Sequence, residues 1–128
     1  MLALEGIKIL DFSRQAPGPF CTMILGDLGA EITKIEVPPG VTRIRAGEAS
    51  DQEKRNALYQ AANRNKKSIG LNLQSEEARQ IVYQMAENAD VVIEGFRPGV
   101  TKRLGIDYET LSKINPRIVY CSISSYGQ

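Results

Sequence analysis

Residues 8–36 constrain the fold of this chain more than any other stretch. Ile7–Asp11 is mostly apolar, as a strand covered on both faces would be. The turn Ser13–Pro19 contains two prolines and a glycine, and Pro19 suits the first turn of a helix, where a missing N–H costs nothing. Glu31–Glu36 has the pattern of a second strand. A strand, a helix and a strand at this length form a βαβ unit, so we expect the two strands to be parallel.

Helical spacing indicates further elements. The helix after Pro19 carries an apolar stripe that we expect to face the core: Phe20, Cys21, Ile24, Leu25 and Leu28. Gly29 is placed to end that helix. A second helix should begin after Ser75, whose hydroxyl can accept a hydrogen bond from the first turn. A third should run from Tyr108 to Ile114, with Asp107 as its cap.

The order of elements predicts the fold class. Three more segments have strand patterns: Ser68–Leu73, Asp90–Glu94 and Arg117–Ile123. Strands that alternate with helices predict a doubly wound α/β domain. The charged excursion Val37–Lys67 is long for a compact domain, with a short helix expected at Ala57–Ala62. Its basic end, Asn63–Lys67, is either a solvated turn or an anion site that faces a phosphorylated ligand.

The composition excludes several function classes. The formal net charge of +1 does not indicate a nucleic-acid partner. No apolar run approaches the roughly 20 residues of a membrane span, and the N-terminus lacks a secretory pattern, so we expect a cytoplasmic protein with no membrane partner. The absence of histidine removes Ser-His and Cys-His nucleophile pairs and histidine metal sites. Cys21 and Cys121 have no metal or redox spacing, so we expect buried free thiols and no metal.

Three loops should leave the carboxyl ends of strands: Ser13–Pro19, Gly95–Gly99 and Ser124–Gln128. Open α/β sheets bind ligands at that edge, so we expect these loops to share one rim. Arg14, Arg97 and Arg103 can pair with phosphates, and Phe96 offers a face for stacking. The glycine fingerprint of dinucleotide sites and the phosphate-binding loop of ATP sites are both missing, so NAD and ATP are poor candidates.

Carboxylates end three of the expected strands: Asp11, Glu36 and Glu94. Each can act as a base or nucleophile if its pKa is suitably tuned. The structural alternative, which we favour, is that each accepts hydrogen bonds from nearby turn amides.

Several runs together resemble the class III CoA-transferase family, of the CaiB/BaiF type: LDFSRQAPGPFCTMILGDLGAEITKIE, NRNKKSIGLNL and ADVVIEGFRPGVTKRLGIDYETLSKINPRIVYCSISSYGQ. This family includes formyl-CoA transferase, carnitine CoA-transferase and α-methylacyl-CoA racemase, and the resemblance runs from about Leu4 to Gln128. It implies a Rossmann-like, mostly parallel sheet with helices on both faces. It also implies coenzyme A or acyl-CoA as substrate with no covalently bound cofactor, a carboxylic acid as second substrate, and an interlocked homodimer.

The resemblance further implies which residues contact CoA. Arg14, Gln15 and Ala16 match the loop beside the thioester, and Leu71, Leu73 and Gln74 match the border of the nucleotide end. Gly95, Phe96 and Arg97 match the turn at the adenosine and phosphates, and Arg103 and Leu104 match the next motif, in which the arginine contacts a phosphate. Val37 and Gln74 depart from the arginine and lysine that are common in the family, and Gly95 replaces the asparagine of many transferases, although racemase-like members also have a glycine there.

No catalytic residue is implied within the chain. Family members are much longer, and their catalytic aspartate lies beyond the match to Tyr126-Gly127-Gln128. We therefore expect residues 1–128 to be the N-terminal CoA-binding domain of a truncated CoA-transferase. Such an enzyme moves CoA between carboxylic acids through an aspartyl-CoA thioester. Residues 1–128 alone should be inactive. The alternatives are an α-methylacyl-CoA racemase-like enzyme and a non-catalytic CoA-binding module or fragment.

Overall fold

A computed structural model describes residues 1–14, 16–38 and 57–127 of the chain. Within them a five-stranded sheet has the order β3-β2-β1-β4-β5. The strands are β1 (Lys8–Asp11), β2 (Glu31–Glu36), β3 (Lys66–Gly70), β4 (Val91–Glu94) and β5 (Val119–Ser122). The helices are α1 (Pro17–Asp27), α3 (Glu76–Ala86), α4 (Val100–Leu104) and α5 (Tyr108–Ile114), and residues 57–62 are also helical.

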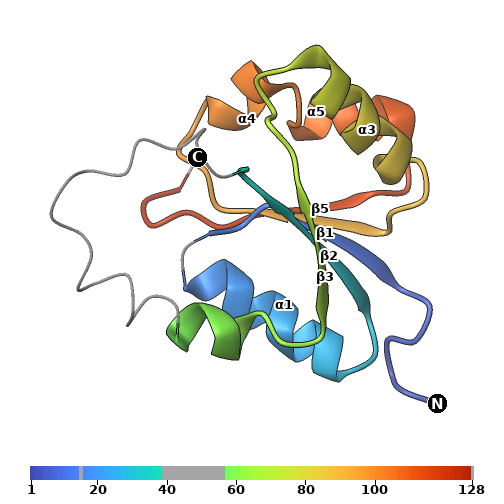
Figure 1. The fold of residues 1–128 in the computed structure, drawn as a ribbon. Helices are drawn as coiled ribbons and strands as arrows, with labels where there is room; N and C mark the ends of the chain where they lie inside the picture. Colours follow the sequence, from blue (N-terminus) through green and yellow to red (C-terminus); the bar gives the residue numbers. More distant parts are fainter. Residues whose placement is uncertain (15, 39–56, 128) are drawn as a thin grey trace, which may run out of the picture.

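Every neighbouring pair of strands in this sheet is parallel, which confirms the predicted α/β class. Helix α1 lies on one face, and α3, α4 and α5 lie on the other (Figure 1). Strand β1 is central, with β2 on one side and β4 on the other. The chain therefore reverses its direction of travel across the sheet beside β1, and such a switch point is where open α/β sheets bind ligands.

Two apolar cores cover the two faces, because alternate residues of a strand point in opposite directions. Leu10 of β1 belongs to the larger core, together with Val82 of α3 and Leu111 of α5. Ile9 belongs to the smaller core on the α1 side, with Ile32 as a neighbour.

The expected core stripe of α1 is wrong for three of its residues. Phe20, Ile24 and Leu28 are 56%, 43% and 45% exposed, whereas Cys21 and Leu25 are half-buried. The helix instead buries its small residues: Gly18, Pro19, Thr22 and Gly26. Small residues allow the helix to lie close to the sheet, since a Cβ on Gly26 would stand 3.3 Å from Cγ1 of Ile32. The side of α1 that faces the sheet is therefore set by its small residues and not by the apolar spacing of the sequence.

Other boundaries follow local chemistry. The caps are confirmed, since Ser75 accepts a hydrogen bond from the Ala78 N–H and Asp107 accepts one from the Thr110 N–H. Strand β3 begins two residues before the predicted Ser68, because Lys66 and Lys67 pair with β2. Helix α4 was not predicted, and its five residues are too few to show a helical period. No helix in the described residues has the length and apolarity to cross a membrane.

Candidate functional site

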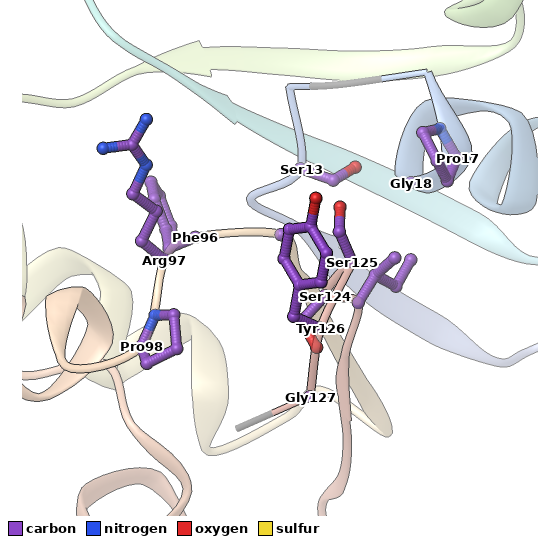
Figure 2. A pocket seen from close by; sticks show the side chains of 12 residues that line it. Ser13, Pro17, Gly18, Phe96, Arg97, Pro98, Ser124, Ser125, Tyr126 and Gly127 are labelled. Carbon is purple, nitrogen blue, oxygen red and sulfur yellow. The ribbon is translucent and has the colours of Figure 1, made fainter.

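A pocket of about 910 Å³ opens at the carboxyl ends of β1, β4 and β5. Its described lining is Ser13, Pro17, Gly18, Gly95, Phe96, Arg97, Pro98, Ile123, Ser124, Ser125, Tyr126 and Gly127. Figure 2 shows Phe96 and Arg97 on one side of the pocket and Pro17 and Gly18 on the other. The volume suits a ligand of the size of a cofactor, for which sites of roughly 300–1,000 Å³ are usual. The prediction that three loops share one rim is confirmed.

The first loop is organised by the buried carboxylate of Asp11. Its Oδ1 accepts a hydrogen bond from the Ser13 N–H at 2.9 Å and another from the Ser13 hydroxyl. Its Oδ2 accepts one from the Thr22 hydroxyl at 2.5 Å. The prediction that Asp11 accepts a turn amide is thereby confirmed. Gly18 packs against the same serine, and an added Cβ there would lie 2.1 Å from Cβ of Ser13.

Two lysines complete this cluster. Lys34 of β2 donates to the Ser13 carbonyl at 2.8 Å, and Lys66 of β3 donates to the Pro19 carbonyl at 3.0 Å and to the Thr22 hydroxyl at 2.7 Å. Their ammonium groups lie 4.0 and 3.4 Å from Oδ2 of Asp11. Burial lowers the pKa of both ammonium groups, and the Asp11 carboxylate opposes that shift.

The basic run Asn63–Lys67 was expected to be either a solvated turn or an anion site. Neither description fits Lys66, because its side chain is 2% exposed and already bonded within the protein. Arg64 and Lys67 pair with surface carboxylates, as in a solvated turn. Lys34 was not among the residues predicted to form the site. Its signal was present, since a lysine between the apolar residues Ile32 and Ile35 of a central strand must be buried and therefore needs a partner.

The turn after β4 is held in a similar way. Glu94 is 2% exposed, and its Oε2 accepts a hydrogen bond from the Phe96 N–H at 2.8 Å while Oε1 accepts one from the Ser122 hydroxyl. The turn-amide prediction is thus confirmed for Glu94. For Glu36 the prediction stays untested, because residues 39–56 of the following turn lie outside the described residues; within these, its carboxylate accepts hydrogen bonds from the hydroxyl groups of Tyr59 and Ser68.

The structure brings together part of the predicted CoA-binding set. Gly95, Phe96 and Arg97 line the pocket, the Arg14 guanidinium lies over the Phe96 ring, and Ala16 is the N-cap of α1. Gln15 lies outside the described residues.

The other predicted residues are not in the described pocket lining. Leu71 and Leu73 are buried in the larger core, where α3 packs, and Gln74 is exposed beyond them. Arg103 is exposed on α4, whereas Leu104 packs against the core. In the chain, Leu71, Leu73 and Gln74 follow β3, whereas Arg103 and Leu104 belong to α4, which comes after β4.

Fold and pocket together define an α/β domain with a candidate ligand pocket at the switch point of a parallel sheet. A family model described as CoA-transferase family III matches residues 4–128. The chain therefore belongs to CoA-transferase family III, as the sequence motifs indicate.

Three curated relatives show how far the similarity extends. The chain is 49% identical to an acyl-CoA transferase of Fusarium pseudograminearum, covering 98% of this chain and 29% of the relative. It is 42% identical to the succinyl-CoA:glutarate CoA-transferase of Mus musculus, covering 100% of this chain and 29% of the relative. It is 46% identical to the acetyl-CoA:oxalate CoA-transferase of Acetobacter aceti, covering 97% and 32%. The chain thus spans about a third of the length of these relatives.

Solved structures agree. A hypothetical protein of Mycobacterium tuberculosis superposes with a TM-score of 0.85 at 38% identity, covering 99% of this chain and 35% of that one. A CaiB/BaiF family protein of Brucella suis superposes with a TM-score of 0.82 at 35% identity, covering 98% and 34%.

Proposed function

We propose that these residues are the acyl-CoA-binding part of an enzyme that transfers CoA between carboxylic acids. The observation that carries this proposal is the pocket at the switch point, where Arg97, Phe96 and the adjacent Arg14 offer cationic and aromatic groups to one ligand. Membership of CoA-transferase family III supports CoA as that ligand. The relatives cited above are named as transferases, which supports transfer over the racemase-like alternative.

The described side chains divide the work of binding in this proposal. Arg97 pairs with phosphate oxygens, and the half-buried ring of Phe96 stacks on the adenine. The loop that contains Ser13 and Gly18 lies along the pantetheine arm and leads it towards the thioester. The aspartate that forms the covalent thioester lies beyond residue 128. The complete protein is an interlocked cytoplasmic homodimer.

Calorimetric titration of the purified chain tests the binding. We expect CoA to bind and to raise the melting temperature, because a ligand that binds only the folded state stabilises it. Arg97→Ala should weaken CoA binding about tenfold, the effect of one lost charge-assisted contact of roughly 1.4 kcal/mol. Lys113→Ala removes a lysine from the last turn of α5 and serves as the control. Stabilisation by NAD or ATP but not by CoA would contradict the proposal.

A transfer assay tests the position of the catalytic group. The purified chain should not move CoA from succinyl-CoA to glutarate or from acetyl-CoA to oxalate. Transfer above the rate without protein would show that these residues carry the catalytic group themselves.

A further inference from the structure

We propose that Lys34 and Lys66 are positioning residues that anchor the two ends of the first loop, at Ser13 and Pro19, and so set the pocket wall. The functional part of this inference rests on the proposed function, because that wall is assigned to the pantetheine arm of CoA.

The need for such anchors follows from the loop's composition. Pro17 and Pro19 have no N–H group, so the loop is poor in amide donors. Its carbonyl oxygens can still accept hydrogen bonds, and these require donors from elsewhere. Lys34 supplies a donor to the Ser13 carbonyl at 2.8 Å, and Lys66 supplies one to the Pro19 carbonyl at 3.0 Å.

The sheet places both donors beneath the loop. Asp11, at the end of β1, lies opposite Lys34 in the β1–β2 register, and Lys66 lies opposite Ile32 in the β2–β3 register. Lys34 and Ile32 are two residues apart on β2, so they share one face of the sheet, which is the face covered by α1. The carboxylate of Asp11 accepts a hydrogen bond from the Ser13 N–H of the loop, and its Oδ2 lies 4.0 and 3.4 Å from the ammonium groups of Lys34 and Lys66.

The energetics favour a positioning role over a role in stability alone. Two ammonium groups and one carboxylate are buried here, with side-chain exposures of 5%, 2% and 0% for Lys34, Lys66 and Asp11. Taking such charges out of water is costly, and apolar residues of similar size often stabilise a protein equally well. What apolar residues cannot do is donate to two carbonyl oxygens at chosen places.

The anchors act on the pocket through the packing of Ser13 against Gly18. Both residues line the pocket, and their contact leaves no room for an added Cβ at Gly18. If the Ser13 carbonyl is released, the backbone can move away from Gly18 and that part of the wall is lost. The turn after β4 is held separately by Glu94, so Phe96 and Arg97 should stay in place.

Lys34→Met tests the anchor because it keeps the length of the side chain and removes the donor. The variant loses the hydrogen bond from Lys34 to the Ser13 carbonyl, worth roughly 1.4 kcal/mol, so the loop should open more often. Amide hydrogen exchange should therefore be about tenfold faster at the Ser13 N–H, which is bonded to Asp11, and unchanged at the Phe96 N–H. CoA should bind about tenfold more weakly. The nucleotide half of CoA, 3′-phosphoadenosine 5′-diphosphate, should bind as it does to the wild type.

Two further variants keep the test decisive. Lys67→Met removes an exposed lysine of the same strand as Lys66 and should change neither exchange nor binding. Lys34→Gln, which keeps a donor on a shorter side chain, should give an intermediate effect and replaces Lys34→Met if that variant does not fold. Unchanged exchange at Ser13, or equal weakening of both ligands, would overturn the inference. If wild-type protein does not bind CoA, the proposed function fails, while the exchange result still decides whether Lys34 anchors the loop.

Discussion

The guanidinium carbon of Arg14 lies 5.4 Å from the centre of the Phe96 ring, so the loop after β1 and the turn after β4 meet at the rim of the pocket. A cation over an aromatic face is attracted by the ring's electron density. This contact joins two segments that are more than eighty positions apart in sequence, at the switch point beside β1.

A double-mutant cycle should show that Arg14 and Phe96 act together in CoA binding. The variants Arg14→Gln and Phe96→Leu should each weaken binding by about twofold to thirtyfold, from a contact of roughly 0.5–2 kcal/mol. The double variant should weaken binding by less than the sum of the two single losses, because both changes remove the contact between Arg14 and the Phe96 ring. Calorimetric titration with CoA measures all four proteins. Fully additive losses would show that the two residues act independently.

The two glycines of the pocket wall should differ sharply in their tolerance of alanine. Gly18→Ala places a Cβ 2.1 Å from Cβ of Ser13, so it should lower the free energy of unfolding by about 1–3 kcal/mol or more. Gly95→Ala places its Cβ 3.8 Å from the Ile123 carbonyl oxygen, an ordinary contact, and should change stability by less than about 0.5 kcal/mol. Urea denaturation followed by circular dichroism compares them. Equal losses would mean that Ser13 and Gly18 are not tightly packed.

The pair formed by Tyr59 and Glu36 should give the protein a pH dependence in alkali. Burial, reinforced by the hydrogen bond to Glu36, raises the pKa of Tyr59 to about 12. Because the folded-state pKa is raised, the stabilisation is complete below the usual tyrosine pKa of about 10 and is lost as the pH rises through about 12. Glu36→Gln removes the carboxylate charge, so the pKa of Tyr59 should fall towards its usual value.

Ultraviolet titration of tyrosinate absorbance, with Tyr59→Phe subtracted from wild type, isolates this group. Ser122→Ala, which leaves Glu36 and Tyr59 in place, is the control. A Tyr59 titration that Glu36→Gln does not alter would show that the carboxylate has no part in the shift.

The exposed apolar face of α1 should promote self-association of the chain and should contribute little to its free energy of unfolding. Phe20→Ser and Ile24→Ser change residues that are 56% and 43% exposed, so the free energy of unfolding should change by less than about 0.5 kcal/mol. Sedimentation velocity at high concentration should show less association, because exposed apolar patches drive contacts between molecules. Leu111→Ala, at a fully buried position, should in contrast cost about 2–5 kcal/mol. Large destabilisation by Phe20→Ser would show that α1 buries this face.

Much of the fold could be predicted because it depends on short stretches of chain. The βαβ unit at the N-terminus, the caps at Ser75 and Asp107, and helix α5 all follow from residues within a few positions of each other. The carboxylates of Asp11 and Glu94 accept amides two residues away, so their roles were also within reach of local reasoning. The family followed from motifs that occur in order along the whole chain.

The sequence by itself determined the alternation of strands and helices, the parallel sheet and the edge of the sheet at which the pocket opens, since periodicity and turn chemistry are local properties. Only the tertiary structure decided that Lys34 and Lys66 are internal anchors, that Arg14 contacts Phe96, and that α1 turns Phe20 outward. Each of these depends on which strands become neighbours and how closely a helix approaches them. The partners of a buried side chain are set by residues distant in sequence, and no local pattern contains that information.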